Sequence, residues 1–176
     1  MKLVNIKRFK NKKALLVFGL IIMGAFQTQA QIAIGGGLGY NEKISAPGVT
    51  VKAEFTITDD IAVSPGVSYF FGNSLYGFNQ NTLAIDVNAH YFFEIIESKL
   101  KIYPLLGLNY SSYKSGASYY SFYYDTYEVS DNAFGVNIGA GGRWKFSEKL
   151  SVYLEPKYVI SEYEQIIINA GILFQL

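Results

Sequence analysis

The sequence has no cysteine, one histidine (His90), one tryptophan and only four prolines among its 176 residues. Without cysteine the chain cannot contain a disulfide framework, a thiolate metal site or a lipid-modified cysteine. No residues follow a metal-ligand spacing, and no glycine-rich loop joins a strand to a helix as in a nucleotide site. We therefore expect neither a metal nor another cofactor.

Acidic residues are absent from the first 30 positions, although six of the 15 basic residues lie there. Beyond position 30, nine basic residues stand against all 14 acidic ones, which gives this part of the chain a net charge of −5. A mildly acidic protein has no electrostatic reason to bind nucleic acid. Nucleic acid is therefore not an expected partner.

The first 30 residues have the three-part layout of a secretory signal. A basic region over residues 1–13 precedes the apolar stretch Ala14–Phe26, and the small residues Thr28 and Ala30 suit a signal peptidase. The apolar stretch is shorter than the roughly 20 residues that a membrane-spanning helix needs. We predict a signal peptide over residues 1–30, cleaved between Ala30 and Gln31, and an exported domain over residues 31–176.

No later apolar run is long enough for a membrane-spanning helix. Instead, glycine (17), tyrosine (15) and phenylalanine (13) are abundant, which suits strands and tight turns. Apolar and other residues alternate with a period of two, the mark of a strand with two different faces. Eight strands are expected, at about Ile32–Asn41, Val49–Thr58, Ile61–Phe71, Leu83–Phe93, Leu100–Tyr110, Ala133–Phe146, Leu150–Ile160 and Ile166–Leu176.

The last segment, Gln165–Leu176, is strand-like and apolar at its end. We expect it to pair with the first strand and so to close the sheet, because closure removes the exposed edges that open sheets must protect. Short turns alternate with longer connections, as in outer-membrane barrels. The turns are Asp59–Asp60, Glu94–Lys99 and Ser147–Lys149, and the longest connections are Asn73–Asn81 and Ser111–Asp131.

Three of the prolines interrupt the expected strands. Pro65, Pro104 and Pro156 each lie in a strand that follows a short turn. Proline cannot donate a ladder hydrogen bond and is usually confined to edges or bulges. We expect these three prolines to lie in bulges near one rim of the sheet.

One face of nearly every strand is apolar and ends in aromatic residues, whereas the other carries glycine, serine, threonine, asparagine and charges. The apolar face would point inward in a soluble barrel and outward in a membrane barrel. Aromatic ends suit two interfacial girdles, and strands of about ten residues match a tilted membrane strand. We predict an all-β fold, an eight-stranded antiparallel up-and-down transmembrane β-barrel.

The charges on the inward face are the first candidate site. An eight-stranded interior is only wide enough for side chains to fill, and buried charges must be paired. We therefore predict that ion pairs and hydrogen bonds plug the lumen, with Arg143 near the centre; a narrow gated pore is the alternative. The set is Lys52, Glu54, Asp86, His90, Lys101, Arg143, Lys145, Glu155 and Lys157.

Four tracts carry a resemblance to a known family: YPLLGLNY from Tyr103, FGVNIGAGGRWKF from Phe134, LSVYLEPKY from Leu150 and AGILF from Ala170. Over residues 31–176 the chain resembles the outer membrane protein beta-barrel domain family, the small OmpA/OmpX-type barrels of Gram-negative bacteria. The resemblance implies an eight-stranded, porin-like barrel at the cell outer membrane. It also implies outer-membrane lipid and the barrel-assembly machinery as partners, and it implies no reaction.

His90 is the one residue that raises the question of catalysis. Its nearest acid on the same strand, Asp86, is about 13 Å away at the rise of a strand, so any partner that orients it must come from another strand. A histidine with no nucleophile motif beside it is a weak signal for an enzyme. We expect no enzyme, with a lipid-modifying membrane enzyme as the alternative.

The second candidate site is the tyrosine-rich tract Tyr119–Tyr127 (YYSFYYDTY) in the longest connection. Such a tract suits an adhesive or recognition patch, since tyrosine is enriched in contact surfaces. Alternatively, two strands extend as a hairpin and the tyrosines pack across it. We expect a structural or surface-interaction role with an extracellular partner, through Tyr119, Tyr120, Phe122, Tyr123, Tyr124 and Tyr127.

Overall fold

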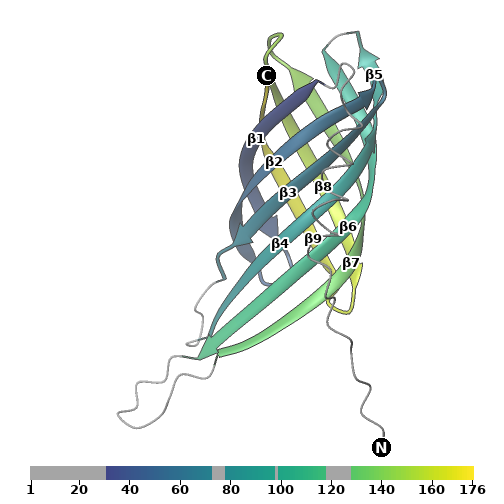
Figure 1. The fold of residues 1–176 in the computed structure, drawn as a ribbon. Helices are drawn as coiled ribbons and strands as arrows, with labels where there is room; N and C mark the ends of the chain where they lie inside the picture. Colours follow the sequence, from purple (N-terminus) through teal and green to yellow (C-terminus); the bar gives the residue numbers. More distant parts are fainter. Residues whose placement is uncertain (1–30, 73–77, 98, 118–127) are drawn as a thin grey trace, which may run out of the picture. The chain divides into compact units, whose positions relative to one another are not determined.

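The alternating segments of the sequence form antiparallel β-strands in a computed structural model, which describes residues 31–176 except 73–77, 98 and 118–127 (Figure 1). The predicted signal peptide therefore lies outside the described residues. In the described part of the chain, no helix is long and apolar enough to cross a membrane. The strands are β1 Ile32–Asn41, β2 Ala46–Thr58, β3 Ile61–Phe70, β4 Phe78–Tyr91, β5 Phe93–Ile96, β6 Leu100–Ala117, β7 Glu128–Lys145, β8 Leu150–Ser161 and β9 Gln165–Gln175.

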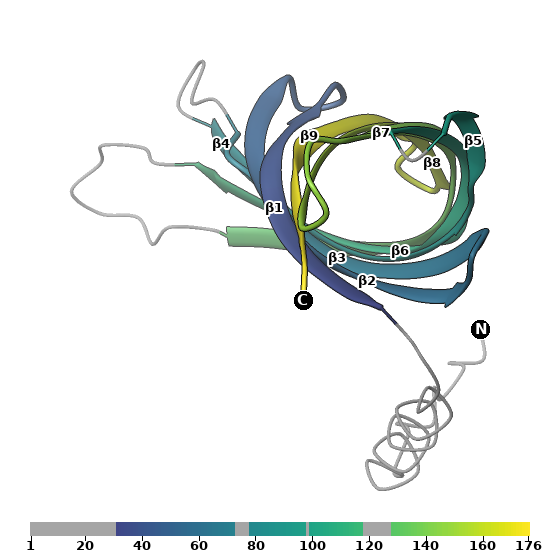
Figure 2. The same ribbon diagram turned by 90° about the horizontal axis from the view of Figure 1, so that it is seen from above.

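The sheet closes on itself, which confirms the predicted barrel. Strands β1 to β4 and β5 to β9 pair with their successors along the chain, β1 pairs with β9, and β4 pairs with β6 and not with β5. Because β4 and β5 continue one another along the same neighbour, with only Phe92 between them, they act as one of eight barrel strands. Figure 2 looks along the barrel and shows the ring of strands around the lumen.

The apolar rows point away from the lumen. Leu38, Val51, Leu108 and Phe134 are 68 to 80 % exposed, while the alternate residues of the same strands are mostly buried. In water such exposure of large apolar side chains would be unfavourable. It is the arrangement that a barrel surrounded by lipid requires, with the apolar face outward and the polar face inside.

The two ends of the barrel differ. At one end, the short-turn rim, the chain turns at 59–60, at 97 and 99, and at 146–149, and the N–H of Leu176 donates to the carbonyl of Ile32 (2.9 Å). At the other end, the long-loop rim, lie the turns at 42–45 and 162–164, the end of β3, the start of β4, the end of β6 and the start of β7. Short turns at one end and longer loops at the other are typical of outer-membrane barrels.

Three of the predicted connections are too long. The predicted loop Asn73–Asn81 includes the start of β4, because Phe78–Asn81 pair with Lys114–Ala117. The predicted turn Glu94–Lys99 includes most of β5. The predicted connection Ser111–Asp131 is paired strand up to Gly116 and from Glu128. In each case cross-strand pairing overrides a local sequence rich in polar and turn-forming residues.

The prediction that three prolines lie in bulges is wrong. Next to each proline, the pairing with one neighbouring strand is interrupted for a short distance. That neighbour is β2 for Pro65, β4 and β5 together for Pro104, and β7 for Pro156. The register is the same on both sides of each interruption, so no extra residue is inserted. Proline removes a ladder bond without requiring an extra residue. Opposite Pro65, the carbonyl of Ala53 instead accepts a bond from the Ser64 hydroxyl (3.0 Å). The register shifts lie nearer the short-turn rim, at Thr56–Thr58 and Glu94–Ile96.

Candidate functional site

A fork of two hydrogen bonds joins β2 to β7 inside the lumen. Arg143 Nη1 donates to Glu54 Oε1 (2.6 Å), and Nη2 donates to Oε2 of the same carboxylate. The Glu54 side chain is 2 % exposed and that of Arg143 is 15 % exposed. Parallel bonds between a guanidinium and a carboxylate combine charge with fixed geometry. This pair therefore fixes the two strands at one level of the lumen.

A second ion pair joins β2 to β8. Lys52 Nζ donates to Glu155 Oε1, and the Tyr103 hydroxyl donates to the same oxygen (2.6 Å). The Lys52 ammonium also lies 4.5 Å from the centre of the Tyr153 ring. A buried charge needs such partners, because burial removes it from water.

His90 on β4 lies between the two acidic residues. Its Nδ1 is 3.3 Å from Glu54 Oε2 and its Nε2 is 3.9 Å from Glu155 Oε1. The ring stacks on Tyr103, with centroids 4.6 Å apart and planes 28° apart. The carboxylates that face the histidine thus come from β2 and β8, and not from Asp86 on its own strand. No Ser or Thr hydroxyl donates to His90 in the described part of the chain.

A layer of amides surrounds the third pair. Lys157 Nζ lies 2.5 Å from Asp86 Oδ2, and the other oxygen of that carboxylate accepts bonds from Asn109 and Asn137 (both 2.8 Å). Asn137 also donates to Asn88 Oδ1 (2.7 Å). The predicted site did not include these asparagines, although each lies on an inward row with the charged residues. Their position on that row was the signal that could have identified them.

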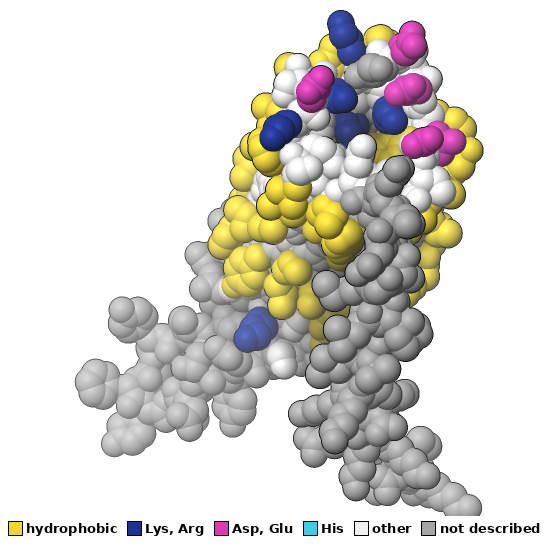
Figure 3. Space-filling model, turned by 45° about the horizontal axis from the view of Figure 1, so that its top comes forward, with side chains coloured by type: hydrophobic (Ala, Val, Ile, Leu, Met, Phe, Trp, Pro, Cys, Tyr) yellow, Lys and Arg dark blue, Asp and Glu magenta, His cyan; other side chains and the backbone are white. Residues whose placement is uncertain are grey.

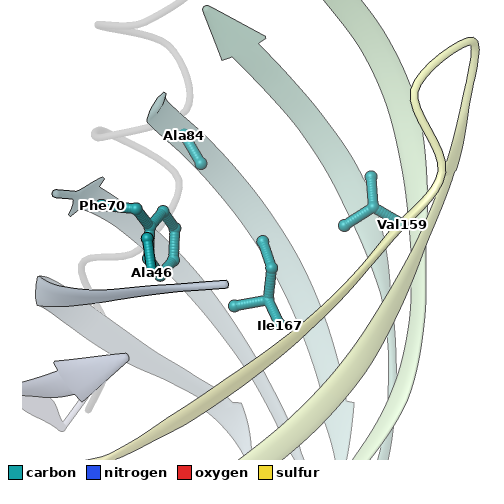
Figure 4. Packing of buried hydrophobic residues seen from close by; sticks show 5 residues of the cluster. All are labelled: Ala46, Phe70, Ala84, Val159 and Ile167. Atoms are coloured by element: carbon teal, nitrogen blue, oxygen red, sulfur yellow. The ribbon is translucent and has the colours of Figure 1, made fainter. Parts of the chain in front are cut away.

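An apolar layer lies inside the barrel towards the long-loop rim, where a polar interior was expected. It consists of Ala46, Phe70, Ala84, Val159 and Ile167, all with 0 % exposure (Figure 4). A Cβ on Gly48 would overlap the Phe70 ring, and one on Gly39 would lie 3.0 Å from it. These two glycines therefore leave the space into which Phe70 packs. Tyr103 lies in the same way over Gly141, directly opposite on β7.

Two residues of the predicted lumen site lie apart from these pairs. Lys101 is at the short-turn rim, where it lies 3.5 Å from Glu94, and both side chains are more than one third exposed. Lys145 is exposed on the last position of β7. The inward row continues to the end of each strand, but water can solvate a lysine at the rim, so it needs no buried partner.

At the long-loop rim, a cluster of side chains connects two turns to the β6–β7 hairpin. The Tyr163 hydroxyl donates to Asp131, and the Tyr163 ring lies 5.1 Å from the Tyr113 ring and 5.1 Å from Lys43 Nζ. The hydrogen bond to Asp131 and the negative charge of this residue raise the pKa of the Tyr163 hydroxyl. The predicted contact residues Tyr119, Tyr120, Phe122, Tyr123, Tyr124 and Tyr127 lie outside the described residues.

Solved structures share this fold. The N-terminal β-barrel domain of Pseudomonas aeruginosa OprF is 18 % identical and matches with a TM-score of 0.59, covering 84 % of this chain and 100 % of that one. A major outer membrane protein of Thermus thermophilus is 11 % identical, with a TM-score of 0.67 and coverage of 85 % and 100 %. Ail, the attachment invasion locus protein of Yersinia pestis, is 15 % identical, with a TM-score of 0.58 and coverage of 84 % and 97 %. A sequence search of curated proteins finds no match.

The closed barrel, its outward apolar rows and these structural matches define an integral outer-membrane β-barrel. A family model described as "Outer membrane protein beta-barrel domain" matches residues 14–172, so the chain belongs to this family. The protein is located in the outer membrane, with lipid against its apolar rows. Since short turns are periplasmic in such barrels, the short-turn rim faces the periplasm and the long-loop rim faces the outside of the cell.

Proposed function

We propose that this protein is a structural outer-membrane barrel that presents a recognition surface outside the cell. The observation that carries the proposal is the length of the β6–β7 hairpin. Its two strands have 18 residues each and pair as far as Gly116 and Glu128, whereas β8 ends opposite Gly135. The hairpin therefore continues beyond the neighbouring strand at the rim that faces the surroundings, where loops commonly carry function.

The composition of the segment between β6 and β7 supports a recognition role. Residues 118–127 include five tyrosines and one phenylalanine, and such aromatic residues are enriched at protein contact surfaces. The fold similarity to Ail, whose name refers to attachment and which has been solved with the heparin analogue sucrose octasulfate, is consistent with this role. The partner we propose is an extracellular surface molecule.

Replacing Tyr119, Tyr120, Tyr123 and Tyr124 together with serine is expected to reduce binding of the protein to host cells or matrix by about tenfold or more. Aromatic anchors often contribute over about 1 kcal/mol each to binding. Binding of fluorescent vesicles that carry the protein would measure the loss. Tyr76→Ser, in the connection between β3 and β4, is the matched control and should retain binding. Equal binding by the four-fold variant, with a normal heat-shift on a gel, would remove the recognition role.

We also propose that the lumen is closed. The three buried ion pairs, the asparagines around Asp86 and the apolar layer with Phe70 all support a filled interior, because their buried side chains lie inside the barrel. The alternative is a narrow pore, which the number of charges in the lumen favours. We propose further that the signal peptide directs export of the protein and that the barrel-assembly machinery inserts it into the outer membrane.

Planar-bilayer recordings distinguish a closed lumen from a pore. The purified protein is expected to give no steps of ion current, because the apolar layer has no group that would hydrate an ion. Steps in the unmodified protein that change size in Arg143→Ala would establish the pore instead. A sham insertion with detergent alone is the control for leakage.

We infer no enzymatic role. His90 is 1 % exposed, and its two nitrogens face the carboxylates of Glu54 and Glu155. A general base must come within hydrogen-bond reach of the substrate proton that it removes. The buried position of His90 between two acidic residues favours a structural part in the lumen.

A further inference from the structure

Positively charged side chains face each other across β6 and β7 at the short-turn rim. Lys101 lies directly opposite Arg143. Two residues further towards the short-turn rim, the N–H of Lys145 donates to the carbonyl of Lys99 (2.8 Å). These two lysines are therefore also neighbours across the strands. Like charges directly opposite one another destabilise an antiparallel pair. Two successive positions of this kind therefore require compensation by negative charge.

The chain compensates for one position of the two. Arg143 is bound by Glu54, and Lys101 lies 3.5 Å from Glu94. The Phe92 ring lies 4.8 Å from Arg143 Cζ and 5.8 Å from Lys101 Nζ, which adds attraction between its face and both cations. The inner position of the cluster is thus balanced within the chain.

The outer position has no ion pair of its own. Lys99 and Lys145 are exposed, and neither lies within 4.0 Å of a carboxylate oxygen in the described part of the chain. The other acidic residues near this rim are Glu97 and Glu148, in the turns next to Lys99 and Lys145, and Asp59 and Asp60 in the β2–β3 turn, but none of them forms an ion pair with either lysine. Figure 3 shows acidic and basic side chains gathered at this rim above a belt of hydrophobic ones.

We propose that Lys99 and Lys145 bind a phosphate group at the periplasmic end of the barrel. A phosphate oxygen between the two ammonium groups would replace their repulsion by two charge-assisted bonds. The phosphate can belong to an anionic phospholipid of the inner leaflet or to a free periplasmic molecule. Trp144 and Phe146, on either side of Lys145, are 39 % and 65 % exposed on the lipid side, which places this rim at the headgroup level that aromatic residues mark.

Two measurements distinguish these sources. In detergent, the purified protein is titrated with inorganic phosphate, and the amide chemical shifts of residues 99–101 and 143–145 report binding. The protein is also inserted into two preparations of phosphatidylcholine vesicles that contain phosphatidylglycerol. In one preparation phosphatidylglycerol carries brominated acyl chains, which quench tryptophan fluorescence, and in the other phosphatidylcholine carries them. Trp144 is the only tryptophan of the chain, so its quenching reports which lipid lies beside Lys145.

The test variant is Lys99→Gln with Lys145→Gln, and the matched control is Lys43→Gln with Lys114→Gln, which removes two exposed lysines from the long-loop rim. The test variant is expected to bind phosphate about 25-fold more weakly, at about fivefold for each lysine near an anionic surface, while the control binds as the unmodified protein does. Added salt should weaken the binding, since exposed charges are screened.

The lipid measurement decides the source. Stronger quenching by brominated phosphatidylglycerol than by brominated phosphatidylcholine, lost in the test variant alone, assigns the site to a headgroup. Phosphate-dependent shifts without this preference assign it to a free phosphate compound. The proposal is overturned if the unmodified protein shows neither effect, or if the control variant loses as much as the test variant. Both variants should keep the heat-shift of the folded barrel, because all four lysines are exposed.

Discussion

Replacing Arg143 with alanine is expected to lower the free energy of unfolding by about 3–5 kcal/mol, the usual cost of leaving a buried charge without its partner. Glu54 would lose both guanidinium hydrogen bonds while its side chain remains 2 % exposed. His90 Nδ1 would remain 3.3 Å from the Glu54 carboxylate. Unfolding by urea in detergent or in lipid vesicles, followed by Trp144 fluorescence, measures the change.

Lys101→Ala is the matched control, because it removes one cation from the same face of the neighbouring strand. Its pair with Glu94 is more than one third exposed, and such pairs contribute about 0–1 kcal/mol. The double variant Glu54→Gln, Arg143→Met should recover much of the loss, since it removes both buried charges together. If Arg143→Ala costs no more than Lys101→Ala, the fork does not stabilise the barrel.

The direction of the side chains could be predicted from the sequence wherever the two rows differ. In β2, Val49 and Val51 alternate with Thr50 and Lys52, and the structure places the valines outside and their neighbours inside. A period of two fixes the face of every residue once one row is assigned to lipid. The eight strands and the closure of β1 on β9 follow from the same pattern.

The contacts across the lumen could not be predicted in this way. Glu54 and Arg143 are separated by 89 positions along the chain, and the stagger of the strands around the barrel decides which levels meet. The same stagger brings His90 between Glu54 and Glu155 and leaves Lys101 and Lys145 at the rim. Alternation gives the face of a residue, but it does not give its height in the barrel.

The apolar layer was missed for a different reason. Ile167 lies within the run Ile166–Ile168, where both faces of β9 are apolar and the pattern has no contrast. Phe70 was hidden beside Tyr69 and Phe71 in the same way. The glycines that receive Phe70 and Tyr103 lie on other strands, so only the register shows that the small and the large residue face each other.

Replacing Gly37 with valine is expected to prevent closure of the barrel. Gly37 on β1 lies opposite Gly171 on β9, and a Cβ at position 37 would overlap the backbone carbonyl oxygen of Ala170. A backbone atom cannot move aside as the end of a side chain can, so the cost should exceed the about 1–3 kcal/mol of ordinary overpacking. The variant should lose the heat-shift of the folded barrel on a gel and become accessible to protease.

Gly142→Ala on β7 is the matched control, because a Cβ at that glycine would meet no atom within 4 Å. It should fold as the unmodified protein does, or slightly more stably, since alanine restricts the unfolded chain more than glycine does. Loss of folding in both variants would indicate that glycine is needed for general flexibility of the strands. Loss in Gly37→Val alone shows that the pair β1–β9 closes the barrel only because its two backbones approach without side chains between them.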